Sequence, residues 1–309
     1  MKSLYNIVIC ACVATLISCN IDEEFEGGDG IESVFATNVF EYTPAPGQFI
    51  NNRISSGFDG SETTARAACE YASKRLEKRQ YVSLGGFGGY LVVGFDHKIT
   101  NSRGGYDLAI AGNPFEGSSE PGVVWVMRDE NENGEPDDVW YELIGSESGK
   151  SGTIHNYSVT YHKPSGAKQP ICWEDSLGES GEIAHIAAHS HDSYYPAWIE
   201  AESYTLRGTR LAPRTHFNGS IWIQEGFAWG YVDNENDEDL WRGVGKFAGM
   251  DFNRFRLSDA MDADGEPANL EYIDFVKVQT ALNSQSGGLG ENSTEVFAIC
   301  DYKAMISAL

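Results

Sequence analysis

Hydrophobic and polar residues alternate in short runs along most of the chain, and this pattern is typical of β-strands. The clearest runs are GVVWVM at 122–127, VWYELI at 139–144 and IDFVKVQT at 273–280. Weaker runs of strand character occupy 81–84, 90–95, 106–110, 156–161, 194–199, 205–209, 220–224, 227–232, 252–257 and 295–299. The pattern therefore predicts an all-β chain.

One segment has helical rather than strand spacing. Small and apolar residues recur every three or four positions from Ala65 to Leu76, behind Ser61, which can cap a helix. We expect one short N-terminal helix that ends near Arg79. The basic run at its end is interpreted as the solvated face of a helix packed on the core.

No repeat of fixed short length is present, although both halves contain an aromatic strand, an acidic turn and another strand. This arrangement favours a two-sheet β-sandwich, jelly-roll-like and with long loops, over a propeller with regular blades. Residues 163–195 are expected to form a long, loop-rich middle section.

The turn between 122–127 and 139–144 reads DENENGEPDD, with Asp and Asn at alternate positions before a glycine. This order is the first half of a calcium loop of the EF-hand kind, here between strands. Trp140 stands where the final bidentate Glu is expected, so Asp138 or Glu142 would replace it. The predicted ligands are Asp129, Asn131, Asn133, Glu135, Asp137 and Asp138. A solvated hairpin turn is the alternative, since the same residues favour turns.

Two further acidic turns are weaker calcium candidates. The stretch DNENDED at 233–239 is dense in acids and could equally be a solvated turn. The stretch DADGEP at 262–267 fixes the spacing of only two ligands, Asp262 and Asp264. We expect Ca²⁺ to have a structural role.

Charge narrows the class of partner. The chain has 46 acidic and 22 basic side chains, for a formal net charge of −24. Such a surface repels nucleic acid and anionic membrane, so neither is expected to bind it directly. The charge is compatible with several bound divalent cations.

The first residues have the features of a targeting segment. Lys2 precedes a short apolar run, and the run ends in LISC at 16–19, which resembles a bacterial lipobox. We predict a lipoprotein signal peptide at 1–18, lipidation of Cys19, an acidic flexible tether at 19–33 and a single ligand-binding domain at 34–309. The expected location is the outer membrane, lipid-anchored and exposed at the cell surface. A plain cleaved secretory signal is the alternative.

Cysteines and histidines give weaker signals. Cys69, Cys172 and Cys300 lack metal-type spacing and are interpreted as free thiols, with at most one disulfide. His185, His189 and His191 could be structural, could face a ligand or could bind metal. No HExxH frame supports a metalloprotease.

Several motifs carry a resemblance to a known family: YVSLGGFGGY, SSEPGVVWV, PDDVWYE, YYPAWI, WGYVDN and DADGEPANLEYIDFVKVQT. Between about 81 and 302 the chain resembles the "cell surface protein" lipoproteins of Bacteroides-type bacteria, which are associated with TonB-dependent corrinoid (vitamin B12) uptake. The resemblance implies a surface protein, not an enzyme, that binds a corrinoid and delivers it to a TonB-dependent outer-membrane transporter. We expect a monomer.

Flat aromatic side chains suit a broad corrinoid ring. The candidate ligand contacts are Trp173, His189, His191, Tyr194, Tyr195, Trp198, Trp229, Tyr231 and Trp241. Two alternatives stay open: a calcium-stabilised surface glycan-binding protein or glycan-active enzyme, and an adhesin domain. No nucleophile elbow, catalytic triad frame or zincin motif supports catalysis.

Overall fold

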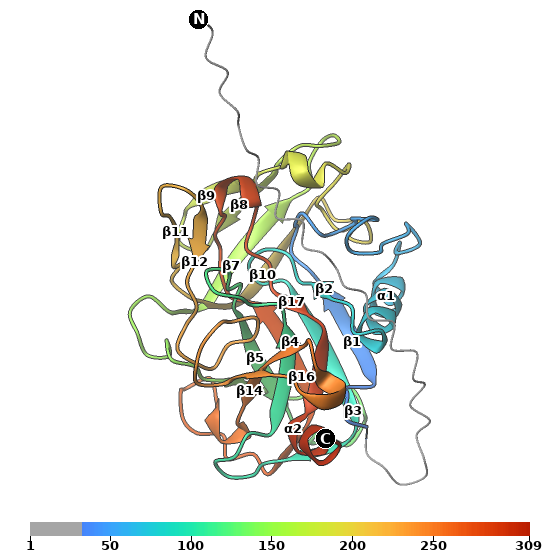
Figure 1. Ribbon diagram of the computed structural model, residues 1–309. Coiled ribbons are helices and arrows are strands. Elements are labelled where there is room, and N and C mark those ends of the chain that lie inside the picture. The colour runs from blue at the N-terminus through green and yellow to red at the C-terminus, as the bar shows by residue number, and fades with distance from the viewer. Residues whose placement is uncertain (1–32) are drawn as a thin grey trace, which may run out of the picture. The chain divides into compact units, whose positions relative to one another are not determined.

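Antiparallel strand pairing accounts for most of the regular structure in the computed structural model, which describes residues 33–309 (Figure 1). The contacts group Glu32–Leu309 into one unit. The predicted signal peptide, Cys19 and nearly all of the tether lie outside the described residues. Within 33–309, no helix is both long and apolar enough to cross a membrane.

The largest sheet has six strands and is organised around a central strand near the C-terminus of the chain (Figure 1). Val276 and Val278 of that strand are fully buried, whereas Lys277 between them faces the other side of the sheet. Its order is β1 (Asn38–Thr43), β3 (Tyr90–Thr100), β16 (Tyr272–Thr280), β5 (Gly122–Met127), β6 (Trp140–Leu143) and β15 (Ala260–Met261).

Two four-stranded sheets and two short strand pairs contain the other named strands of residues 33–309. One sheet has the order β10 (Ser203–Arg210), β7 (Ile154–His162), β8 (Ile171–Asp175) and β9 (Ser180–Ile183). The other has the order β13 (Leu240–Arg242), β14 (Asp251–Phe255), β4 (Leu108–Gly112) and β18 (Ala298–Asp301). The pairs join β11 (Thr215–Phe217) to β12 (Trp222–Gln224), and β17 (Glu295–Val296) to β2 (Val82–Ser83).

The expected N-terminal helix is present as α1 (Ala65–Glu77). Its cap is Thr64 rather than Ser61, because the Thr64 hydroxyl accepts a hydrogen bond from the Ala67 N–H. A second helix, α2 (Tyr302–Ser307), follows the last strand and was not predicted. Short 3₁₀ turns lie at η1 (Ala187–His189), η2 (Gly245–Phe247), η3 (Leu257–Asp259) and η4 (Gly287–Leu289).

The mainly β class is confirmed, and the sheets are antiparallel. The finer prediction of a jelly-roll-like, two-sheet sandwich stays a prediction. The strands expected at 194–199 and 227–232 are wrong, because Pro196 and the positive φ of Gly230 bend these aromatic runs into turns. The middle section, expected to be loop-rich, also contains β8 and β9.

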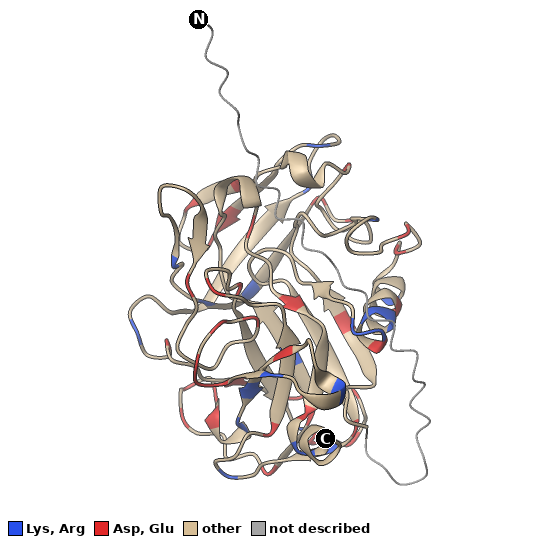
Figure 2. Cartoon of the chain, in the orientation of Figure 1, with Lys and Arg blue, Asp and Glu red and all other residues tan. Residues whose placement is uncertain are grey.

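Acidic residues are spread over many separate loops and strands of the chain (Figure 2). Several basic residues lie along α1, as the sequence pattern suggested (Figure 2). The charge of the chain therefore does not by itself locate a site.

Candidate functional site

Three acidic side chains from distant parts of the chain converge at one point. Glu120 precedes β5, Asp233 begins the second acidic stretch, and Glu295 is the first residue of β17. One oxygen from each lies within 4.8 Å of the others. In residues 33–309, this is the one group of three or more His, Cys, Asp or Glu side chains close enough to hold a metal ion.

Backbone hydrogen bonds fix the segments that carry these carboxylates. The Glu120 N–H donates to the Asp233 carbonyl at 2.9 Å, and the hydroxyl of Thr294 donates to the Glu120 carbonyl at 2.8 Å. The Asp233 carboxylate accepts the N–H groups of Asn113 and Glu295, at 2.9 and 3.0 Å. The carboxylate of Asp233 is therefore held by backbone donors from two other segments.

A glycine makes room for the carboxylate of Asp233. A Cβ atom on Gly112 would lie 2.6 Å from Asp233 Oδ1 and 2.8 Å from its Cα. No side chain fits between these atoms, so glycine is required at the end of β4 for this approach.

The electrostatics of the group are unfavourable for three negative charges. Asp233 and Glu295 are 1% and 3% exposed, and Glu120 is half-buried. No ion pair in the described part of the chain involves any of the three. Burial raises the pKa of the Glu120 carboxyl to about 7. Burial, reinforced by the neighbouring carboxylates, raises the pKa values of Asp233 and Glu295 well above their usual range.

Neighbouring donors relieve only part of this charge, and one of them is the Gln224 side-chain amide, which donates to Glu120 Oε1 at 3.5 Å. The Ser293 hydroxyl donates to Glu295 Oε1 at 2.6 Å, and the Ser293 N–H donates to Glu120 at 3.2 Å. Either bound protons or a cation would neutralise the rest. A set made only of carboxylate oxygens suits hard cations such as Ca²⁺, Mg²⁺ or Mn²⁺, so the triad could hold a metal ion.

The predicted calcium loop forms the connection of the β5–β6 hairpin, as its flanking strands indicated. Asp129 accepts the N–H groups of Asn133 and Gly134, at 3.2 and 2.8 Å. Asn131 and Asn133 each accept the N–H two residues later, at 3.0 and 2.8 Å. Gly134 has a φ of 77°, the left-handed conformation that the sharp bend requires.

The carboxylates of this hairpin loop do not converge as those of the triad do. Asp137 accepts hydrogen bonds from the side-chain amides of Asn131 and Asn133, and Asp138 accepts the Glu130 N–H at 2.8 Å. Glu135 is exposed. Calcium at these residues stays a prediction.

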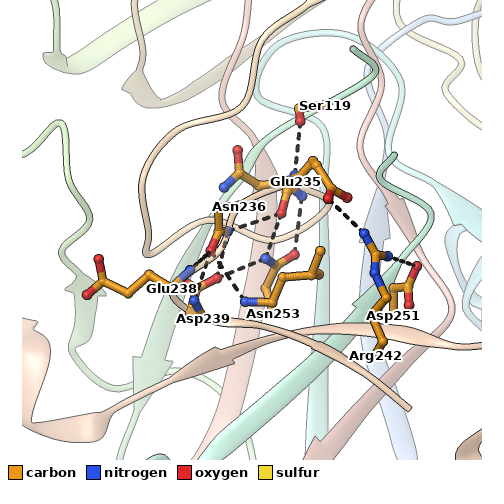
Figure 3. A network of polar contacts seen from close by, with 10 residues as sticks. Ser119, Glu235, Asn236, Glu238, Asp239, Arg242, Asp251 and Asn253 are labelled. Atoms are coloured by element: carbon orange, nitrogen blue, oxygen red, sulfur yellow. Dashed lines mark hydrogen bonds and ion pairs between the residues drawn. The ribbon is translucent and has the colours of Figure 1, made fainter. Parts of the chain in front are cut away.

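The second acidic stretch divides into two parts with different partners. Asp233 belongs to the triad, whereas Glu235, Asn236 and Asp239 belong to a separate polar network with residues of other segments (Figure 3). Asp239 accepts amide hydrogens from Asn236 and Asn253 at 2.8 and 3.0 Å, and Asn236 Oδ1 accepts three backbone N–H groups (Figure 3). Arg242 bridges Glu235 and Asp251 in the same network. Protein donors therefore satisfy the carboxylate of Asp239, whereas Glu235 pairs with Arg242 through Oε1 and its Oε2 is buried without a hydrogen-bond partner.

The third acidic turn lies between β15 and β16, and the side chain of Asp262 stabilises it through hydrogen bonds to backbone N–H groups of the same turn. Asp262 Oδ1 accepts the N–H groups of Asp264 and Glu266, both at 2.9 Å. Asp264 is exposed. The structure adds no further ligand to this turn, and calcium there also stays a prediction.

The histidines of the middle section hydrogen-bond within the protein. His191 Nε2 lies 2.7 Å from the Ile50 carbonyl, and His185 Nε2 lies 2.8 Å from the His191 carbonyl. His189 Nδ1 lies 3.3 Å from the amide of Asn52. The rings of His185 and His191 also pack on Tyr194, at 4.7 and 5.0 Å between centroids. These contacts favour the structural interpretation of the cluster.

The aromatic residues predicted to contact a ligand do not form one face. Tyr194, Tyr195, Trp198 and Tyr231 are buried, and they belong to three different core clusters. The remaining predicted contacts, which are half-buried and spread over the unit, are Trp173, His189, His191, Trp229 and Trp241. The side chain of Tyr231, for example, is buried and packs on Phe227, with 5.3 Å between the ring centroids.

Trp173 is the one predicted contact that lines a cavity next to β8. The cavity has a volume of about 140 Å³ and lies where β7, β8 and β9 meet the loop at 282–291. Glu291 also lines it. The segment 291–295 thus supplies one residue to the cavity and another, Glu295, to the triad.

Sequence reasoning missed Glu120, Glu291 and Glu295 as site residues. Glu120 lies inside the SSEPGVVWV motif and Glu295 begins a predicted strand, but neither is spaced like a metal ligand. A single acidic residue next to a strongly apolar strand was the signal available, since charged side chains are rarely buried without a partner.

Known proteins give no further guide to this geometry. No family model matches the chain, and no curated protein is similar to it. The resemblance to surface lipoproteins stays a prediction.

Proposed function

We propose that the protein is a non-catalytic binding protein stabilised by calcium. The cation would be bound by Glu120, Asp233 and Glu295. One observation carries the proposal: three carboxylates converge in the interior without a basic partner. A cation there would join the segments before β5, after Tyr231 and at β17, which are far apart in the sequence. The metal would thereby stabilise the fold and the nearby cavity wall.

Calcium is the cation that we propose for this set of ligands. Ca²⁺ takes six to eight oxygen ligands and tolerates irregular geometry, whereas Mg²⁺ requires a near-ideal octahedron. The triad supplies carboxylates alone and lies partly at the surface through Glu120, which leaves room for backbone oxygens or water.

For the ligand, we propose a corrinoid, on the basis of the sequence resemblance. The cavity of about 140 Å³ admits only a small group, so a corrinoid would lie across the outer surface. Trp173, Trp229 and Trp241, which are not fully buried, are the aromatic contacts that fit this proposal best. Anchoring through Cys19 at the cell surface and delivery to a TonB-dependent transporter are part of the same proposal.

The calcium proposal is tested by melting the purified chain in EDTA and then with Ca²⁺, Mg²⁺ or Mn²⁺. At a concentration of about 100 times Kd, a bound cation stabilises by roughly 2.7 kcal/mol. For a domain of this size that corresponds to a rise in Tm of roughly 5–10 °C. Glu295→Gln keeps the acceptor for Ser293 but removes one charge, and we expect it to lose most of the rise.

The matched control is the double variant Asp129→Ala and Asp137→Ala in the hairpin loop. If calcium at the triad braces the fold, this variant keeps most of the rise in Tm. A rise that survives in Glu295→Gln but disappears in the hairpin variant would place the stabilising calcium in the hairpin instead. An unchanged melting curve in EDTA and in Ca²⁺ would refute the proposal.

The corrinoid proposal has a separate test. Titration with cyanocobalamin, followed by calorimetry and absorbance, should give saturable binding that Trp173→Ala weakens by about tenfold, since aromatic contacts dominate such interfaces. Binding of oligosaccharides with no response to cyanocobalamin would support the glycan-binding alternative.

A further inference from the structure

The cavity next to β8 has walls of a specific kind. Phe87, Tyr161 and Trp173 provide aromatic surface in its lining. The Trp173 ring is held in place by its partner across the strand pair, because a Cβ atom on Gly181 would lie 2.6 Å from it. Tyr161 donates its hydroxyl hydrogen to the Phe87 carbonyl at 2.8 Å, so this donor is already used.

Glu291 provides the acidic part of the wall. It is 3% exposed, and its Oε1 accepts the Gln48 N–H at 2.7 Å. Its Oε2 is buried and accepts no hydrogen bond. No ion pair in residues 33–309 involves this carboxylate. A buried acceptor without a donor costs free energy, so its presence beside a cavity calls for a ligand.

We propose that this cavity binds a small organic cation, of the ammonium class, between the Glu291 carboxylate and the Trp173 ring. The carboxylate supplies the counter-charge, and aromatic rings attract cations through their negative faces. A volume of about 140 Å³ is several times the space of one water molecule, which suits a methylated or short-chain ammonium group. The site goes beyond the calcium proposal and does not depend on it.

Binding of a cation beside Glu291 should be coupled to the release of a proton. Burial raises the pKa of Glu291 to about 8, so the carboxyl of the empty cavity holds a proton at neutral pH. A cation favours the ionised form, and binding therefore releases that proton. Affinity should rise with pH until about pH 8 and then level off.

Other titratable groups act on Glu291, and none supplies a positive charge. Glu120 raises the pKa of Glu291 further through its negative charge. Tyr161 and Tyr194 are themselves influenced by Glu291, and burial raises the pKa of each tyrosine, so both stay neutral in this pH range.

The test uses tetramethylammonium, because this probe does not titrate and any pH dependence then belongs to the protein. Calorimetry in buffers of different ionisation enthalpy should show release of close to one proton per ligand at about pH 6.5 and almost none at about pH 9. Methylammonium should compete for the same site, whereas neutral tert-butanol should not bind measurably. All titrations are made in EDTA, so failure of the calcium proposal does not affect the outcome.

Glu291→Gln keeps an acceptor for Gln48 and should weaken binding at least tenfold while abolishing proton release. Glu182→Gln, the same change at an exposed carboxylate on β9, is the matched control and should bind as the wild type does. Trp173→Leu should weaken binding with proton release retained, and it tests the site even if Glu291→Gln does not fold. Absence of binding by the wild type, or equal binding by Glu291→Gln, would overturn the proposal.

Discussion

The hairpin loop at 129–138 and the triad of Glu120, Asp233 and Glu295 are both rich in carboxylates, but their surroundings are opposite. In the hairpin the acids are mostly exposed, and the carboxylates of Asp129, Asp137 and Asp138 accept hydrogen bonds from their own loop. In the triad two acids are almost fully buried, and three carboxylates face one another.

The difference shows that a high density of acids in a sequence does not identify the carboxylates whose negative charge a bound cation would neutralise. A carboxylate on a loop is hydrated and can use nearby N–H groups, so it stays charged at little cost. A carboxylate brought into the interior by distant segments loses that hydration. Only the second situation creates a large free-energy gain for a bound proton or cation.

The largest expected effect is a pH dependence of the free energy of unfolding that comes from the triad and not from the hairpin loop. Burial raises the pKa of the triad carboxyls in the folded state above the unfolded values, so the folded state holds more protons. In EDTA the free energy of unfolding should therefore be highest near pH 5 and fall as pH rises through about 7. For Glu120 alone the loss is on the order of 3 kcal/mol. Urea unfolding between about pH 5 and pH 8 measures it.

Calcium and a triad variant provide the controls for this pH dependence. Saturating Ca²⁺ should flatten the curve above pH 6, because the cation replaces the protons. Glu295→Gln should flatten it in EDTA, whereas Asp137→Ala in the hairpin should leave it unchanged. Glu291 contributes in the same direction through its own raised pKa, so some slope remains in every variant. A curve that rises from pH 5 to pH 8 in EDTA would contradict the assignment.

Much of the fold could be predicted from the alternation of apolar and polar residues. The run at 122–127 matches β5 residue for residue, and 273–280 matches all of β16 except Tyr272. Errors arose where aromatic residues are dense for another reason. Tyr194 and Tyr231 lie in turns and are buried by packing from other segments, which a local pattern does not reveal.

The candidate site was far less predictable than the fold. The hairpin was recognised because its residues are contiguous and its spacing is that of a known loop. The triad takes one residue from each of three segments, and Glu120 and Glu295 are 175 positions apart. Their meeting depends on β5 pairing beside β16 and on β17 pairing with β2, which is tertiary information.

A pair of glycine substitutions should change stability by a smaller amount and compares the triad with the hairpin loop directly. Gly112→Ala should destabilise by about 2 kcal/mol and remove the calcium response, because the added methyl group collides with the backbone and carboxylate of Asp233. Gly134→Ala meets no atom within 4 Å and only strains a residue with positive φ, at about 1 kcal/mol. Its Ala N–H can still donate to Asp129, so the hairpin keeps its hydrogen bond. Melting curves with and without Ca²⁺ compare the two variants directly. If Gly112→Ala retained the full calcium response while Gly134→Ala lost it, the stabilising cation would belong to the exposed loop, and the unusual burial of the triad would have to be explained by bound protons alone.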